Sequence, residues 1–452
     1  MGGTENAADT KDNIFESGNI PKIYFSIAMP LTLSLLLNVV YGIVDTFFVA
    51  RTGNTDLVAA VSLCAPVFTF QMAFGNLFAQ GSSSLISRLL GEDKRDRVFH
   101  VSSFCFYIAI ASGILIGILL LLLQGPVLRF LGTNEATYGY ARDYLRVIAA
   151  GSPFAVLTFI HSNLLRAEGL SKESMIGSVS GSIVNIILDP LFIPLWGAAG
   201  AAFATVLGHV FTDTVLLIMV RKKSRILSVN PAHIPVTGYE LGQVIGIGVP
   251  ASLSNVMLMF STILTNQFLL PYGNERIASL GIAHRGVMIA SMVMTGFTFG
   301  GAPLFGYYYG AKDRKRLSET YRFAFRLITV LAVSLSVVIF AAAPIFIRLF
   351  MDDAEIIRHG SFILRSHIAT MVLAGLVSLY SIIFQSTGKI RASFFLSLAR
   401  QGLVFIPVLL IMSLLSGYTG IIFAQPFTDV ISLLCALILF RRILWKDFHP
   451  NA

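Results

Sequence analysis

Charged residues are scarce in this chain. Only 13% of its 452 residues are Asp, Glu, Lys or Arg, whereas 55% are hydrophobic. A soluble domain carries about 25% charged residues, so the composition argues against a soluble enzyme or a soluble binding module. The shortage of charge, together with 36 phenylalanines, indicates a polytopic membrane protein.

Cysteine is also rare, and its spacing forms no framework. The chain holds three cysteines, all in apolar runs and none in a CxxC pair: Cys64, Cys105 and Cys435. Isolated cysteines in such runs are usually small buried hydrophobic residues rather than disulfide or zinc partners. We therefore expect no metal site and no cofactor.

Sequence signatures of catalysis are missing as well. The chain contains no HExxH, GxSxG or GxxxxGK[ST] motif, so neither a metal set nor a phosphate-binding loop is indicated. The net charge of +9 does not indicate nucleic acid, because the basic residues lie between apolar segments rather than on one face. We expect neither an enzyme nor a nucleic-acid-binding protein.

Long apolar segments make up most of the chain. A helix needs about 20 apolar residues to cross the hydrocarbon layer. Twelve segments meet this length: 20–50, 57–88, 98–124, 137–165, 173–195, 199–220, 240–270, 276–307, 318–342, 356–386, 392–416 and 418–440. The predicted fold is therefore all-α, with twelve transmembrane helices. Residues 1–18 lack the basic start of a signal peptide, and we interpret them as a flexible cytosolic tail.

The connections between these segments alternate in charge. Lys and Arg concentrate in every second connection and at the C-terminus: Arg88, Lys94, Arg95, Arg97; Arg166, Lys172; Arg221, Lys222, Lys223, Arg225; Lys312, Arg314, Lys315, Arg316; Lys389, Arg391; Arg441, Arg442, Lys446. The remaining connections hold few or none. The positive-inside rule then predicts a multi-pass protein of the cytoplasmic (inner) membrane with both termini in the cytosol.

The two halves of the chain resemble each other at an offset of 219 or 220 residues. Five matched segments align these pairs: Pro30 with Pro250, Gly53 with Gly273, Gly91 with Gly310, Gly169 with Gly388, and Gly200 with Gly420. Six spans per half give both halves the same orientation, so the repeats are parallel and related by an axis along the membrane normal. We predict two six-helix repeats around a central cavity: an N-lobe over 19–220, a cytosolic linker over 221–239 and a C-lobe over 240–446.

Acidic residues break this symmetry. Asp45 falls against Thr265, and Asp189 falls against Val408. At about 1.5 Å per residue, Asp45, Asp189 and Thr205 lie at a similar depth in the outer half of the bilayer. A carboxylate at mid-span costs roughly 2.5–3.5 kcal/mol, so such residues normally face a cavity or one another. We interpret these three as members of one polar cluster in the first half.

Further polar residues share the faces of these acids. Asn185 precedes Asp189 by four residues, while Asn38 and Tyr41 precede Asp45 by seven and four, so each set lines one helix face. Two carboxylates in a low-dielectric pocket do not both ionise cheaply, and the cluster should bind at least one proton near neutral pH. The alternative is a structural role in caps or hydrogen bonds between helices.

Other residues are weaker candidates. Asp213 and Asp429 lie on the last span of each half, which indicates a shared structural role, although Asp429 is also a candidate cavity residue. His284 and Arg285 are further cavity candidates, with an interfacial position as the alternative. Pro30 is the predicted hinge, because an intramembrane proline kinks its helix.

These features resemble the multidrug and toxic compound extrusion (MATE) family, and within it the DinF-like and MepA-like branches. The resemblance extends from Pro30 to Arg441 and rests on four segments in order, VDTFFVARTGNTDLVAAVS, LLRAEG, NIILDPLFI and GAAGAAFAT. It implies an N-lobe cation site for H⁺ or Na⁺ made of Asp45, Asn185, Asp189 and Thr205, with Asn38, Tyr41 and Asn163 around it. The C-lobe acids of NorM-like members, in spans 7 and 10, have no counterpart here, which favours proton coupling in the N-lobe.

We therefore expect a monomeric secondary antiporter that exports lipophilic or cationic organic compounds in exchange for protons by alternating access. The alternatives are a Na⁺-coupled exporter, a flippase for a lipid-linked saccharide, an integral membrane enzyme and a channel. Few intramembrane Lys or Arg residues disfavour the flippase. The paired halves and the one-sided ion site favour a carrier over a channel.

Overall fold

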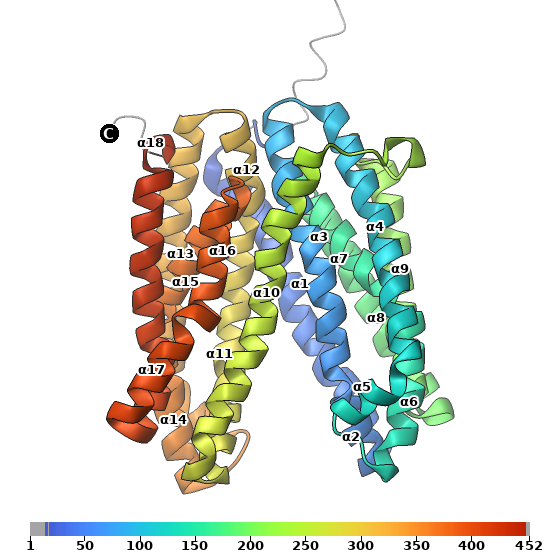
Figure 1. Ribbon diagram of the computed structural model, residues 1–452, viewed down its shortest axis with the longest axis vertical. Helices are drawn as coiled ribbons and strands as arrows, with labels where there is room; N and C mark the ends of the chain where they lie inside the picture. The colour runs from blue at the N-terminus through green and yellow to red at the C-terminus, as the bar shows by residue number, and fades with distance from the viewer. Residues whose placement is uncertain (1–13, 17, 449–452) are drawn as a thin grey trace, which may run out of the picture. The chain divides into compact units, whose positions relative to one another are not determined.

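The computed structural model describes residues 14–16 and 18–448, and these residues form helices with no strand (Figure 1). The elements are α1 (Ile20–Ala50), α2 (Thr55–Leu63), α3 (Ala65–Gly91), α4 (Arg95–Leu122), α5 (Gln124–Phe130), α6 (Glu135–Ala150), α7 (Ser152–Ala167), α8 (Ser171–Trp196), α9 (Ala198–Lys223), η1 (Pro231–His233), α10 (Gly238–Leu269), η2 (Leu270–Tyr272), α11 (Asn274–Gly300), α12 (Ala302–Gly310), α13 (Arg314–Arg348), α14 (Ala354–Ala369), α15 (Met371–Ser386), α16 (Ile390–Leu398), the π-helical turn η3 (Ala399–Leu403), α17 (Phe405–Ile443) and α18 (Trp445–Phe448).

The apolar helices account for the predicted spans. Nine helical stretches in the described residues are long and apolar enough to cross a membrane, and two bent pairs, α6 with α7 (51°) and α14 with α15 (45°), raise the number to eleven. One of the nine, Ile390–Ile443, runs across Gly417, whose backbone is not helical (φ 56°, ψ −127°). Division of this stretch at Gly417 gives the twelve predicted spans. The chain is a multi-pass membrane protein.

The repeat is visible in the backbone. Gly197 (φ 57°, ψ −128°) and Gly417 (φ 56°, ψ −127°) share one conformation 220 residues apart. Three more pairs have positive φ at matching positions: Gly53 with Gly273, Asp93 with Lys312, and Gly169 with Gly388. A Cβ on Gly200 would lie 2.0 Å from the Phe192 carbonyl oxygen, and one on Gly420 would lie 1.8 Å from that of Met412. Both halves therefore turn and pack their last two spans in the same way.

Two compact units divide the chain, and the boundary cuts through the first helix of each half. One unit comprises 1–32, 87–93 and 258–452, and the other comprises 33–86 and 94–257. Helix α1 thus passes from one unit to the other after Thr32, two residues beyond Pro30. Pro30 lies inside a continuous helix, and its role as a hinge stays a prediction. The predicted lobes also stay a prediction. In the two compact units, the inner part of α1 (residues 20–32) is grouped with the second half, and the inner part of α10 (residues 238–257) is grouped with the first half.

Glycines make this exchange sterically possible. In the first unit, a Cβ on Gly300 of α11 would lie 2.4 Å from the Ala28 Cα of α1. In the second unit, Cβ atoms on Gly81 of α3 and Gly248 of α10 would lie 1.9 and 1.7 Å from the carbonyl oxygens of Val244 and Leu77. Any side chain at these positions would separate the helices. The inner part of α1 therefore packs closely on α11. In the other unit, the inner part of α10 packs on α3 in the same way.

The predicted tail 1–18 falls largely outside the described residues, but its described end is held in place. Phe15 is 1% exposed and stacks on the Tyr307 ring, with 4.8 Å between the centroids. Its carbonyl oxygen accepts hydrogen bonds from the Tyr308 hydroxyl and an Arg316 guanidinium nitrogen, both at 2.8 Å. Phe15 is therefore held against α12 and α13, while the flexibility of the tail as a whole stays a prediction.

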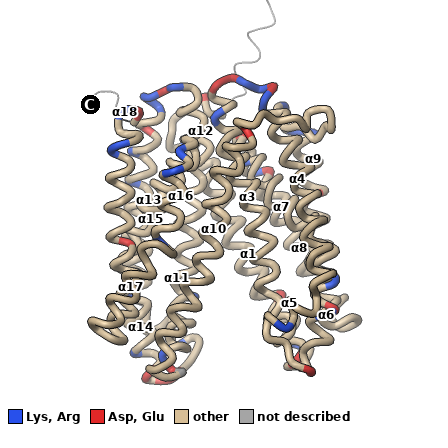
Figure 2. Tube along the Cα trace, viewed as in Figure 1, with Lys and Arg blue, Asp and Glu red and all other residues tan. Residues whose placement is uncertain are grey.

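Charge follows the helix ends. In the unit that contains α12 and α18, Figure 2 shows Lys and Arg gathered at the ends of the helices beside these two elements, with few along the helices. This distribution is that of a chain whose helical shafts lie in lipid and whose basic loops lie in water.

Candidate functional site

The predicted acidic cluster is assembled by three helices of one unit. Asp189 (0% exposed) and Asn185 (2% exposed) share the buried face of α8. Asp45 of α1 is half-buried, and its carboxyl is close enough to that of Asp189 for the two charges to interact. The Asn185 amide donates to the Thr205 hydroxyl of α9 at 3.4 Å. The structure thus brings together the four residues proposed for the cation site.

The oxygen atoms of this cluster are unsatisfied. One carboxyl oxygen of Asp45, both of Asp189 and the amide oxygen of Asn185 are buried without a hydrogen-bond partner in the described part of the chain. A buried carboxylate without a partner costs several kcal/mol. Such a group is stabilised by a bound proton or a small cation. Chemically, the cluster is therefore suited to the reversible binding of a cation.

Two tyrosines extend the cluster, and sequence reasoning found only one. The Tyr41 side chain of α1 interacts with the Thr205 side chain. The Tyr144 side chain of α6 lies within electrostatic range of Asp45 and Asp189. Tyr140 and Tyr144 are four residues apart and share one face of α6, but this spacing alone does not point to the cluster. Both pack on the apolar group around Val49 and Ile193 at this end of the unit.

Two predicted supporting residues lie differently. Asn38 is exposed on α1. Asn163 is 8% exposed and donates to the Phe159 carbonyl oxygen of its own helix at 2.8 Å. Asn163 therefore satisfies its amide within α7, and a place for it around the cation site stays a prediction.

The cavity candidates of the second half fall into separate local contacts. The His284 ring lies 5.6 Å from the His367 ring, and the Arg285 guanidinium lies 5.8 Å from the centre of the Phe350 ring. Asp429 is 2% exposed and forms an ion pair with Arg400 at 2.8 Å. These contacts do not test a cavity role.

Asp213 and Asp429 do not share a structural environment. Asp213 accepts a hydrogen bond from Thr158 at 2.9 Å, and its other oxygen has no partner among the described residues. Asp429 has an arginine partner instead. The expectation of one shared role is wrong, because the two residues lie one turn apart when the halves are aligned by Gly200 and Gly420.

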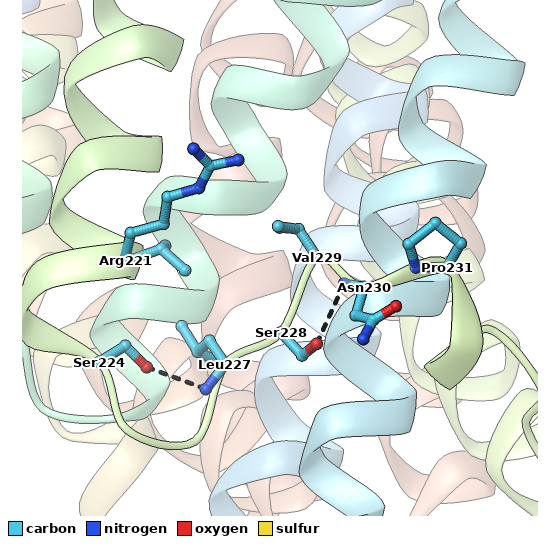
Figure 3. Close-up of a pocket in the computed structure, with 8 residues that line it drawn as sticks. Arg221, Ser224, Leu227, Ser228, Val229, Asn230 and Pro231 are labelled. Carbon is cyan, nitrogen blue, oxygen red and sulfur yellow. Dashed lines mark hydrogen bonds between the residues drawn. The ribbon is translucent and has the colours of Figure 1, made fainter.

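A pocket of about 410 Å³ lies at the end of α9 that carries Arg221 (Figure 3). The residues that line it come from the end of α9 and the linker: Val220, Arg221, Ser224, Leu227, Ser228, Val229, Asn230 and Pro231. Arg221 follows Thr205 by sixteen residues on α9, which corresponds to about 24 Å along the helix. Within the described residues, no group of three or more His, Cys, Asp or Glu is placed to hold a metal ion.

Comparisons with known proteins agree with this architecture. A model of the MatE family matches the chain twice, at residues 30–191 and 250–411, which repeats the internal offset of 220. The chain is 32% identical to Multidrug export protein MepA of Staphylococcus haemolyticus (strain JCSC1435) over 428 residues, 94% of each chain.

Solved structures share the fold. A multidrug resistance MATE family transporter of the MOP superfamily, solved in an outward-facing conformation, superimposes with a TM-score of 0.89 at 22% identity, covering 96% of this chain and 98% of the other. A MOP superfamily transporter from Pyrococcus furiosus also gives 0.89 at 22% identity, covering 97% and 99%.

Proposed function

The chain belongs to the MatE family, and we propose that it is a multidrug exporter that exchanges lipophilic or cationic organic compounds for protons. The relatives named Multidrug export protein MepA, which align over almost their whole length, support export of such compounds. Proton exchange is supported by the acidic cluster. We further propose that the protein works as a monomer in the cytoplasmic membrane, with both termini in the cytosol.

One observation carries the proposal: Asp45 and Asp189 are neighbours whose buried oxygens lack partners among the described residues. Protonation neutralises a carboxyl and removes the cost of its burial. A proton arriving from outside would therefore bind here and stabilise one packing of α1 against α8 and α9. Loss of the proton would favour another packing.

Helix α1 provides the link from the proton to transport. Its outer part carries Asp45 and Tyr41, whereas its inner part, up to Thr32, belongs to the other unit. A change of α1 at the acidic cluster is therefore transmitted along one helix into the other half of the protein. In alternating access, this change would accompany release of the substrate to the outside.

Sodium is the rival coupling ion, because carboxylate, amide and hydroxyl oxygens from Asp45, Asp189, Asn185 and Thr205 are also hard ligands. Reconstituted protein separates the two ions. Ethidium efflux from vesicles should follow an imposed pH gradient and be indifferent to a Na⁺ gradient imposed at constant pH. Efflux driven by Na⁺ alone would replace the proton with sodium at the same site.

The decisive variant is Asp45→Asn, which keeps the shape of the side chain and removes its titration. We expect proton-driven ethidium efflux to fall at least about tenfold. Asp56→Asn, at an exposed position of α2, is the matched control. Full proton-driven efflux by Asp45→Asn would refute the proposal.

A further inference from the structure

The second half contains a charge site of its own, built around Asp429 of α17. The Arg400 Nε donates to Asp429 Oδ1 at 2.8 Å, and the Gln425 amide donates to the same oxygen at 3.2 Å. The Thr370 hydroxyl donates to Oδ2 at 3.3 Å. The Asp429 side chain is 3% exposed and that of Arg400 is 29% exposed. Both carboxyl oxygens therefore have partners inside the second half.

This site lies deep in the membrane-spanning region. Arg400 follows Lys389 by eleven residues, and Asp429 precedes Arg441 by twelve. At about 1.5 Å per residue, each lies roughly 16–18 Å from a basic helix end, near the middle of a hydrocarbon layer about 30 Å thick. Ionisable residues at this depth are rare and are normally functional.

Two of the spans that build this site correspond to spans of the acidic cluster in the first half, and a third corresponding span contacts the residue beside Arg400. By the repeat, α10 corresponds to α1, the segment containing η3 and the start of α17 corresponds to α8, and the rest of α17 corresponds to α9. Gln425 matches Thr205, and Asp429 follows it by one helical turn. The Ser261 hydroxyl of α10 donates to the Gln401 side chain of η3 at 3.1 Å. Asp429 therefore lies one helical turn from the second-half position that matches Thr205 of the cation site.

A local change of helix type accompanies the arginine. In η3 the Val404 N–H bonds the Ala399 carbonyl oxygen at 3.0 Å, a five-residue step. The matching residues around Gly181 lie in the uninterrupted helix α8. Single π-helical turns are rare and occur frequently at functional sites. The insertion of this turn is specific to the half that carries the internal cation.

The two halves therefore neutralise buried carboxylates in opposite ways. Asp45 and Asp189 have buried oxygens that nothing described in the chain satisfies, whereas Asp429 has a guanidinium at hydrogen-bonding distance. We propose that Arg400 is a fixed cation that takes the place of an exchangeable ion in the second half. This inference rests on the proposed ion site of the first half, and it makes that site the sole point of ion coupling.

Removal of Arg400 should then create a second ion site. The groups that face Asp429 from the other elements, Gln425 on α17 and Thr370 between α14 and α15, are neutral hydrogen-bond donors. The next titratable group on α14, His367, contacts the Ile422 carbonyl oxygen. Without the guanidinium, Asp429 would need a proton or a small cation in order to stay buried.

Proton uptake by the purified full-length protein tests this directly. The weakly buffered protein is moved from about pH 8 to about pH 5.5, and a pH dye measures the number of protons taken up. This interval lies between the usual pKa values of Lys and Glu, so exposed residues of these types contribute little. We expect R400Q to take up one more proton than the wild type. R400K retains the charge and should match the wild type, as should the double variant R400Q/D429N.

The difference between R400Q and R400Q/D429N is the decisive quantity. Equal uptake by these two variants would overturn the inference. Recovery of folded R400Q at acidic pH alone, with the double variant folded throughout, would support it, because a protonated Asp429 needs no counter-charge. The pair Asp45→Asn and Asp189→Asn should lower uptake in the wild-type background. Failure of that result would count against the proposed function and leave the Arg400 comparison intact.

Discussion

The two halves share a backbone and differ in the treatment of buried acids. Gly197 and Gly417 adopt the same conformation, and the closest helix contacts recur at Gly200 and Gly420. The first half nevertheless leaves Asp189 without partners in the described chain, whereas the second half pairs Asp429 with Arg400. One scaffold can therefore hold an exchangeable charge site or a permanently neutralised one, depending on a few side chains.

The largest effect should follow from replacement of Asp189. Asp189→Asn removes titration at a side chain that is 0% exposed, and we expect proton-driven efflux to fall at least about tenfold. The same variant should unfold at a higher temperature, since an unpartnered buried carboxyl destabilises the fold. Thermal unfolding and vesicle efflux on one preparation measure both. Reduced efflux together with reduced stability would indicate a structural role instead.

The second half should respond in the opposite sense. Arg400→Ala leaves Asp429 buried without its charge partner, and we expect a loss of about 3–5 kcal/mol in unfolding free energy at neutral pH. The apolar double variant Arg400→Met with Asp429→Leu should be close to wild type in stability. Unfolding by denaturant in detergent measures the difference. Equal stability of the single and the double variant would remove the distinction between the halves.

Glu168, in the connection after α7, gives a pH test outside the spans. Burial raises the pKa of Glu168 to about 7, although one oxygen accepts from the Arg225 N–H at 3.3 Å. The pKa of Glu168 in the folded protein exceeds its usual value of about 4.5. The protonated side chain therefore contributes its full stability below about pH 4.5, and this contribution is lost as the pH rises through about 7. The matching residue of the second half is Thr387, which does not titrate.

Glu168→Gln should therefore raise stability above about pH 7, by an amount of the order of 2 kcal/mol, and leave it unchanged near pH 4. Unfolding measured across this pH range checks the window. Thr387→Ser, in which the hydroxyl that donates to the Ile383 carbonyl oxygen is kept, serves as the control without pH dependence. A constant difference between Glu168→Gln and wild type at all pH values would contradict the prediction.

The smallest effect tests what the halves share. Gly197→Ala and Gly417→Ala each place a Cβ on a residue with positive φ and ψ near −128°, at a cost of about 1–3 kcal/mol. The added Cβ would lie 3.2 Å from Leu57 Cδ1 in the first half and 2.9 Å from the Tyr272 hydroxyl in the second. We expect similar losses of thermal stability, slightly larger for Gly417→Ala. A large loss in one half alone would show that the two turns are not equivalent.

The sequence predicted those features of the fold and of the site that depend on a single helical periodicity or on the single offset between the halves. The spans, the repeat and the convergence of Asp45, Asp189 and Thr205 followed from length, offset and helical rise. Tyr144 was missed because its contact with the cluster depends on the path of α6, which no short pattern reveals.

The Arg400 pair was missed for a different reason. Arg400 stands inside a segment counted as an apolar span, and it lies in a π-helical turn that the sequence does not signal. Phe15 was assigned to a flexible tail because its contacts with Tyr307, Tyr308 and Arg316 cannot be seen from local composition. In each case the deciding partner is remote in sequence.

The exchange of the inner parts of α1 and α10 has a consequence for the history of the chain. Each unit is completed by a segment contributed from the other half, which is the arrangement of a domain-swapped dimer joined into one polypeptide. An ancestral six-helix protein of this kind would have had no complete monomeric form. Duplication and fusion of such a protein would fix the pairing of two copies and leave each copy free to acquire its own buried charges.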